Sequence, residues 1–229
     1  MIEEPPLLTI RRDFPRPSPQ HLAMLAEVPT GFVADAMNGR GAVDYRIKPL
    51  SSVSKSIVGT AMTCHCGPAD NLALFGALSA ASPGDILVAA TDAFTGTAVV
   101  GDLLLGMARN RGIVALVTDG LARDRSGCLA VGVPLFCAGL TPNSPARNGP
   151  GTVGLPVVLG GVSVEAGDIL VADNDGVVVI PLSRAADVVL QLDSIRASEA
   201  AMEAAVEKGL EVPDFISSIL SGPQVRKLR

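Results

Sequence analysis

The sequence predicts an α/β fold in a single domain. Short apolar runs typical of buried strands alternate with stretches in which apolar residues recur at helical spacing. A chain of 229 residues is long enough to bury one sizeable core. We expect three parts: an extended Pro-rich arm over residues 1–20, an α/β core carrying the functional site over 21–182, and C-terminal helices over 183–229.

The arm is predicted from its prolines, because proline fixes φ and donates no backbone hydrogen bond. It could lie over a neighbouring subunit or be loose. Two short helices are expected next, over Ser18–Ala26 and about Thr30–Met37. The following elements alternate: a strand over 56–64, a helix that begins near Pro68 and ends at Ser82–Gly84, and a strand over 85–90.

The second half of the core continues this alternation. A helix ending at Arg111 begins near Thr97 or Asp102, since both residues are acceptable caps. Strands are expected over 113–118 and 135–138, before a polar loop over 141–154. Two hairpins with turns at 160–161 and 173–176 follow, then a long helix over about 183–208 and a short one from Pro213.

One segment recurs: Gly84–Ala89 has the same pattern as Gly167–Ala172. Glycine and aspartate favour a turn, and the apolar residues after them favour a buried strand. The recurrence therefore indicates a repeated structural unit rather than a duplicated site.

Composition excludes several classes of partner. The net charge is −5, with one tyrosine, six phenylalanines and no tryptophan, which argues against nucleic acid binding. The apolar runs are too short to cross a bilayer, and the N-terminus does not resemble a signal peptide, so we expect a cytoplasmic protein with no membrane partner. The positive mean hydropathy of +0.41 indicates apolar surface buried between subunits.

Two motif fragments lack the context that their function needs. The Gly149–Gly154 segment fits G-x-G-x-x-G, but a loop precedes it and a strand follows, whereas a nucleotide site needs the strand before and a helix after. Cys64-His65-Cys66 resembles part of a zinc site, but only one other histidine is present in the chain. We expect the four cysteines to be reduced and to pack in the core.

The strongest functional candidates are Gly101–Leu104 and the Gly120–Asp124 segment that follows them. Asp102 and Asp124 supply carboxylates, which a hard cation prefers, and Arg123 supplies a planar cation for a 2-oxo acid. The free N–H groups of Leu103 and Leu104 at a helix start would attract a carboxylate, and the glycines permit close approach of a ligand. A helix cap and a surface ion pair would explain the same residues without a ligand.

At these residues the chain resembles the class II 4-hydroxy-4-methyl-2-oxoglutarate/4-carboxy-4-hydroxy-2-oxoadipate aldolase family, which also contains the RraA-like ribonuclease-activity regulators. An aspartate, twenty residues and then Arg-Asp is the diagnostic pattern, matched by Asp102, Arg123 and Asp124. The resemblance covers about residues 28–209. Further motifs that support it are Gly59–Thr63, Asp70–Leu72, Pro83–Val88, Gly132–Pro134, Gly160–Val162 and Gly167–Val177.

The resemblance implies a fold and an assembly. The fold would be an α-β-β-α sandwich similar to the swivelling phosphohistidine domain. The chains would form a homotrimer or homohexamer with active sites between subunits and with the C-terminal helices at the interface.

The resemblance also implies roles for individual residues. Asp124 matches the ligand of Mg²⁺ or Mn²⁺, and Arg123 matches the residue that holds the pyruvyl oxygen. Asp102 matches the carboxylate that orients a metal-bound water, while Gly101 and the amides of Leu103 and Leu104 match the substrate carboxylate site. Glu199 resembles an acid supplied by a neighbouring subunit, and Asp35 stands where relatives often carry glutamate.

The expected activity is cleavage of 4-hydroxy-2-oxo diacids to pyruvate through an enolate, with oxaloacetate decarboxylation as a side activity. The partner is then a small 2-oxo acid, and loops near 64–68 and 141–154 would select its distal half. The alternative is a non-catalytic protein that binds and regulates a ribonuclease E-type enzyme. Regulators of this fold often lack the Arg-Asp pair, which favours the enzyme here.

Overall fold

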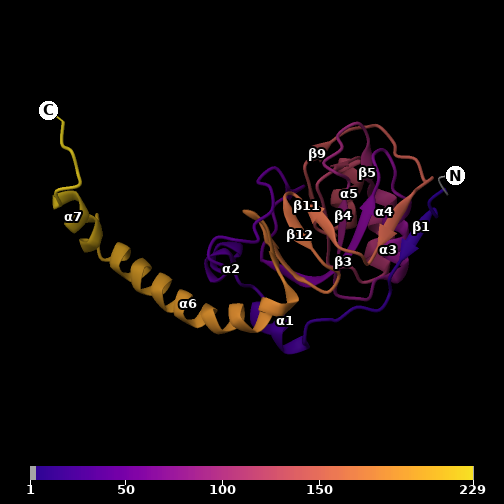
Figure 1. The fold of residues 1–229 in the computed structure, drawn as a ribbon. Coiled ribbons are helices and arrows are strands. Elements are labelled where there is room, and N and C mark those ends of the chain that lie inside the picture. Colours follow the sequence, from indigo (N-terminus) through magenta and orange to yellow (C-terminus); the bar gives the residue numbers. More distant parts are fainter. Residues whose placement is uncertain (1–3, 229) are drawn as a thin grey trace.

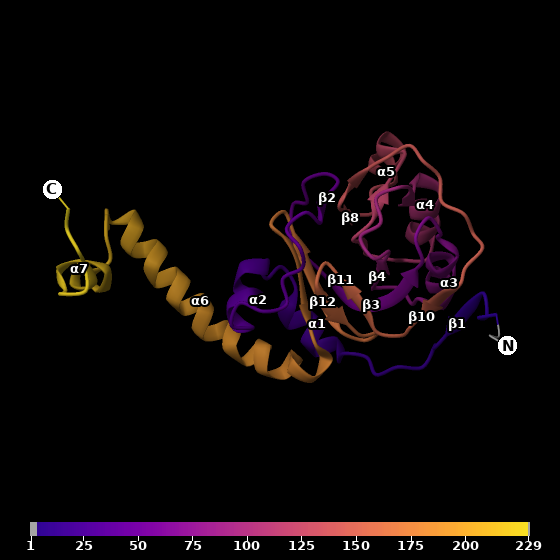
Figure 2. The same ribbon diagram turned by 45° about the horizontal axis from the view of Figure 1, so that its top comes forward.

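A computed structural model describes residues 4–228 as one mixed α/β domain with a helical extension (Figures 1 and 2). The mixed α/β prediction is confirmed, whereas the likeness to the swivelling phosphohistidine domain stays a prediction. Residues 1–3 of the predicted arm and residue 229 lie outside the described residues. None of the described helices combines the length and apolar character needed to cross a membrane.

The main sheet has nine strands and is organised around β3 (Ile57–Cys66). On one side, β3 pairs in parallel with β4 (Asp85–Ala90), which is followed by β6 (Ala115–Thr118) and β8 (Leu135–Cys137). On the other side, its first half pairs with β13 (Ile169–Asp173) and its second half with β10 (Gly151–Val153). The remaining strands are β14 (Gly176–Ile180) beside β13, β1 (Leu8–Ile10) beside β10, and β2 (Lys48–Pro49) beside β8.

Two groups of helices pack against the same face of the sheet at different strands, and each group has its own apolar core. The first core joins β3, β4 and β6 to α3 (Leu72–Ala80), α4 (Asp102–Asn110) and α5 (Arg125–Val131). Another joins β13 and β14 to α1 (Pro19–Leu25), α2 (Thr30–Ala36) and the start of α6 (Ala185–Glu207). A third core lies on the opposite face of the sheet, under the hairpin of β11 (Val157–Leu159) and β12 (Val162–Val164).

A separate three-stranded parallel sheet holds the candidate site. Its order is β5 (Ala98–Val100), β7 (Leu121–Ala122) and β9 (Gly139–Leu140). The sequence reasoning missed all three strands, as well as β1, β2, β10 and α5. The expected helix near 97–111 begins at Asp102, because residues 98–100 form β5 instead.

The N-terminal arm lies along its own chain. Leu8–Ile10 pairs in parallel with Gly151–Val153, and Arg16 makes a bidentate ion pair with Asp85 at 2.7 and 2.8 Å. Asp85 is buried at the first position of β4, and Asp168 is buried at the residue directly before β13. The repeated segment is therefore a repeated turn and strand, as predicted.

The C-terminal helices extend away from the domain (Figures 1 and 2). After a 3₁₀ turn at Leu182–Arg184, the first half of α6 packs on α1 and α2, but its second half and α7 (Asp214–Ser221) lie beyond the domain. In these helices, large apolar side chains are exposed: Leu190, Met202, Val206, Phe215, Ile219 and Leu220.

Candidate active site

The pairing of β5 with β7 brings the two predicted site segments together. Gly101 directly follows β5 and Arg123 directly follows β7, so both leave the same end of two neighbouring parallel strands. The Arg123 N–H donates to the Val100 carbonyl at 3.0 Å and extends the pairing into the site. Loops at this end of a parallel sheet are where α/β proteins commonly bind ligands.

Asp102 is the first residue of α4, with Gly101 as the N-cap. Its Oδ1 accepts a hydrogen bond from the Leu103 N–H at 2.7 Å, so one of the two amides predicted to hold a substrate carboxylate is already engaged. The Leu104 N–H has no acceptor among the hydrogen bonds of residues 4–228. The start of α4 therefore keeps a free donor next to the Asp102 carboxylate.

Arg123 and Asp124 form an ion pair in which Arg123 Nε donates to Asp124 Oδ2 at 2.8 Å. A second guanidinium nitrogen, Arg123 Nη1, donates to Ser144 Oγ in the loop after β9. Asp124 has a left-handed backbone with φ of 57° and stands at the N-terminus of α5. Each side chain is about one third exposed, so the pair is accessible to a small ligand.

Two glycines make room for these carboxylates. A Cβ on Gly101 would lie 2.7 Å from Asp124 Oδ2, and one on Gly127 would lie 2.2 Å from Asp102 Oδ2. No ordinary Cβ contact is that short, so a side chain at either position would displace a carboxylate.

The predicted residues Gly101–Leu104, Arg123 and Asp124 line one cavity of about 340 Å³. Leu103 and Met107 of α4 lie at its exposed side, and the Leu103 side chain is 78% exposed. Four lining residues have no site role predicted from the sequence: Asn71, Phe75, Ser144 and Arg147. Ser144 and Arg147 fall within the loop expected to select the distal half of a substrate, and Asn71 falls in a family motif. The loop assignment and the motif could therefore have pointed to these three residues.

Glu199 and Asp35 do not line this cavity within one chain. Glu199 lies in the second half of α6, which projects from the domain (Figure 2). Asp35 is exposed on α2, which packs against α6 and β14 on the other side of the molecule. Glu199 or Asp35 could therefore reach this cavity only from another subunit.

The donor set matches an open site for a hard cation. Residues 4–228 contain no group of three or more His, Cys, Asp or Glu side chains able to enclose a metal. Asp124 nonetheless presents its carboxylate at the cavity, with Asp102 on the adjoining helix. Mg²⁺ retains several waters and is commonly held by one or two carboxylates together with its substrate, so these residues fit it.

None of the four cysteines lines this cavity. Cys128 packs behind the site, where burial and then the charges of Asp102 and Asp124 raise the pKa of its thiol to about 11. Cys64 and Cys66 are buried 4.0 Å apart on one face of β3, while His65 on the other face pairs with Asp92. All four cysteines are free and buried, as predicted.

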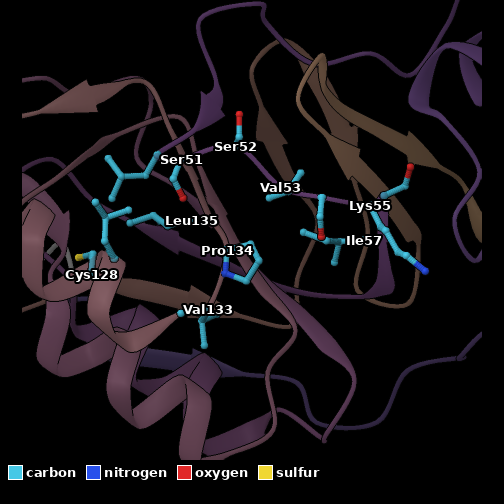
Figure 3. A pocket seen from close by; sticks show the side chains of 14 residues that line it. Ser51, Ser52, Val53, Lys55, Ile57, Cys128, Val133, Pro134 and Leu135 are labelled. Atoms are coloured by element: carbon cyan, nitrogen blue, oxygen red, sulfur yellow. The ribbon is translucent and has the colours of Figure 1, made fainter.

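A second cavity of about 370 Å³ lies beside the opposite end of α5 (Figure 3). Serines of the 51–56 segment and aliphatic side chains such as Val133 and Leu135 line it. Its one lysine, Lys55, forms an ion pair with Glu27. Among the residues that line this cavity there is no carboxylate and no arginine, whereas the first cavity has two of each.

Comparisons with known proteins give a consistent result. The family model described as "RraA-like: Aldolase/RraA" matches residues 30–179. The chain is 36% identical over 179 residues to a Halalkalibacterium halodurans protein named "Putative 4-hydroxy-4-methyl-2-oxoglutarate aldolase", which covers 78% of this chain and 85% of that protein.

Two solved structures have the same overall fold. RraAS2 from Streptomyces coelicolor, described as an unusual member of the RNase ES inhibitor RraA family, is 28% identical with a TM-score of 0.73, over 84% of this chain and all of that chain. An uncharacterized protein from Pseudomonas syringae is 25% identical with a TM-score of 0.74, over 86% and 96% of the two chains.

Proposed function

Because this chain belongs to the RraA-like family, which includes aldolases and RraA proteins, we propose that it is a divalent-metal-dependent lyase. Its substrates are 4-hydroxy-2-oxo diacids of the 4-hydroxy-4-methyl-2-oxoglutarate type, and pyruvate is a product. Oxaloacetate decarboxylation is a side activity, because loss of carbon dioxide from oxaloacetate gives the same enolate.

One observation carries the proposal: a guanidinium and two carboxylates meet at a cavity beside the open start of a helix. Arg123 can bridge two oxygens of a 2-oxo acid because its donors form a planar fork. The free Leu104 N–H can receive the substrate's C1 carboxylate at the positive end of α4. A 2-oxo acid held in this way has its ketone oxygen next to Arg123.

The reaction follows from this placement. Asp102 accepts the proton of the substrate's C4 hydroxyl directly or through a water, and the C3–C4 bond breaks as a carbonyl forms at C4. The bonding electrons pass to C3 and the ketone oxygen, giving the enolate of pyruvate. Arg123 stabilises the charge where it develops, and a proton returned to C3 completes pyruvate.

Mg²⁺ or Mn²⁺ would be held by Asp124, with Asp102 nearby. When bound, the cation supplies Lewis-acid polarisation of the 2-oxo acid. The ion pair with Arg123 leaves Asp124 Oδ1 without a hydrogen-bond donor among the described residues, so one oxygen is available.

We further propose a homotrimer or homohexamer in which Glu199 of one chain approaches the site of the next. The support is the projecting half of α6 that carries Glu199, together with the apolar side chains exposed on α7. The exposure of Leu103 at the cavity is a second support, because a neighbouring chain would cover it.

The activity is tested by pyruvate release from 4-hydroxy-4-methyl-2-oxoglutarate. Chelation with EDTA should abolish turnover and added Mg²⁺ or Mn²⁺ should restore it. Asp124→Asn should lower kcat/KM by roughly a hundredfold or more, because it weakens the proposed cation ligand and the partner of Arg123.

Asp44→Asn is the matched control, since it makes the same chemical change in another Arg–Asp ion pair, with Arg46, outside the cavity. Turnover that survives both EDTA and Asp124→Asn would reject the metal mechanism. Absence of lyase activity combined with stoichiometric binding of a ribonuclease E-type enzyme would support the second candidate, a regulator. That candidate is favoured by the structural likeness to the RNase ES inhibitor family.

A further inference from the structure

We infer that Arg147 and Asn71 form the subsite for the distal half of the substrate, with Arg147 binding its far carboxylate. The inference rests on the proposed function, since it takes the Arg123 end of the cavity as the 2-oxo acid end. A preference for diacids then depends on the guanidinium of Arg147, which lies in the loop over 141–154.

Arg147 is a cation at the cavity without an anionic partner. Its guanidinium carbon lies 5.3 Å from the centre of the Phe75 ring, and both side chains line the cavity. No carboxylate among the described residues forms an ion pair with it. Stacking on an aromatic ring orients the guanidinium and leaves its N–H groups free for a ligand carboxylate.

The backbone on both sides of Arg147 is fixed. Before it, the Ala146 N–H donates to the Ala69 carbonyl at 2.7 Å, and the Ala146 carbonyl accepts from the Asn71 N–H at 3.0 Å. After it, the N–H groups of Asn148 and Gly149 donate to Asp70 Oδ2 at 2.5 and 3.1 Å. Arg147 is thus a long side chain on a positioned backbone, a geometry that suits recognition more than a loose surface arginine does.

Asn71 provides an independent sign of a missing partner. Its Nδ2 donates to the Val99 carbonyl at 3.0 Å, which fixes the amide orientation. Among the described residues, its Oδ1 is the one buried side-chain oxygen or nitrogen without a hydrogen-bond partner, and the residue is 5% exposed. Carboxylates and ketones only accept hydrogen bonds, so the C4 hydroxyl is the group of a 4-hydroxy-2-oxo diacid that can donate to Asn71 Oδ1. It does so in the bound substrate, before its one proton passes to Asp102 at the start of the reaction.

The charges around the cavity agree with a diacid ligand. Asp102 and Asp124 balance Arg123 and Arg147, so the lining side chains have no net charge. The divalent cation of the proposed function would raise the net charge of the cavity to +2. A dicarboxylate neutralises that charge completely, whereas a monocarboxylate leaves half of it unpaired.

Calorimetric titration in the presence of Mg²⁺ tests the inference with non-cleavable ligands. We compare 2-oxoglutarate with 2-oxopentanoate, which lacks the distal carboxylate, and include pyruvate as a ligand for the Arg123 end. The wild-type chain should bind 2-oxoglutarate at least tenfold more tightly than 2-oxopentanoate. Arg147→Gln should remove that preference and leave pyruvate affinity unchanged, whereas Arg109→Gln on the exposed end of α4 should behave as wild type.

Asn71 is tested with 4-hydroxy-2-oxoglutarate in an Asp102→Asn background that prevents turnover. Asn71→Ala should weaken this ligand about fivefold relative to 2-oxoglutarate, with the fold checked by circular dichroism. Arg147 is exposed, so its variant tests the subsite even if Asn71→Ala does not fold.

The outcomes separate the two claims. If no 2-oxo acid binds, both the proposed function and the subsite are rejected. If pyruvate binds but Arg147→Gln leaves the preference for 2-oxoglutarate intact, the subsite alone is overturned.

Discussion

Gly101 determines whether the two halves of the site can approach each other. Its missing Cβ leaves space for Asp124 Oδ2 and for Arg123 Cγ, which would lie 2.7 and 3.1 Å from an added carbon. With φ of −140°, the backbone here is open to any residue, so the requirement for glycine comes from the neighbouring side chains. Glycine is therefore needed at this position to make space for Arg123 and Asp124, and not to permit the backbone conformation.

Gly101→Ala should lower kcat/KM for pyruvate release at least tenfold, because the Arg123–Asp124 pair must shift away from the start of α4. Gly106→Ala is the matched control on the same helix, since its added Cβ would meet Val131 at an ordinary 3.9 Å. The control should retain activity and be slightly more stable. Equal activity in the two variants would show that the close contact does not matter.

At the residue scale, the sequence was informative where neighbouring residues share a motif. Asp102, Arg123 and Asp124 were singled out by type and spacing, and the structure places all three at one cavity. Ser144, Asn71 and Arg147 were not identified individually, because their relation to the site depends on contacts across the fold. The Ser144–Arg123 hydrogen bond, for example, joins residues 21 apart.

At the element scale, the short strands were the hardest to foresee. Ala98–Val100 has three residues directly before α4, so its apolar side chains read as part of the helix. Leu8–Ile10 is a strand because it pairs with Gly151–Val153, which in turn pairs with β3, and these segments are far apart in sequence. Longer elements such as β4 and α6 were predicted well, since many of their own residues carry the periodic pattern.

The loop that carries Arg147 depends on Asp70, a buried carboxylate that accepts three backbone N–H groups, from Leu72, Asn148 and Gly149. Asp70→Ala should lower the free energy of unfolding by about 1–3 kcal/mol and weaken the preference for 2-oxoglutarate over 2-oxopentanoate. Urea titration measures the first effect and calorimetry the second.

Asp168→Ala is the control for that variant, because Asp168 is also buried and accepts backbone N–H groups from Glu165 and Leu182. It should cost similar stability without changing ligand preference. If both variants alter the preference to the same extent, the effect belongs to general destabilisation and not to the loop.

At the scale of the whole molecule, the most conspicuous feature is the helical extension (Figure 1). Phe215 and Ile219 occupy one side of α7 and are 61% and 58% exposed. Hydropathy indicated that apolar surface would be buried between subunits, but a single chain could not show which surface. Six large apolar side chains are exposed on α6 and α7, and these make the two helices our candidate for that surface.

Light scattering after size-exclusion chromatography tests this assembly. The wild-type chain should have the mass of a trimer or hexamer, and the double variant Phe215→Asp/Ile219→Asp should shift it towards smaller species. Ser217→Asp/Ser221→Asp introduces the same charges on the opposite side of α7 and should leave the mass unchanged. A monomeric wild-type chain would contradict the proposal.

The separation of the small sheet from the large one has an evolutionary consequence. The nine-stranded sheet and its three apolar cores hold most of the buried residues, whereas β5, β7 and β9 position the candidate site. Val99, Val100 and Ala122 of these strands belong to the first apolar core, whereas Gly101, Arg123 and Asp124 follow the strands and lie outside it. Mutations of the residues that follow the strands can therefore change the chemistry at less cost to folding than mutations within the strands. Such a division lets one ancestral fold diverge into lyases and into proteins that act only by binding other macromolecules.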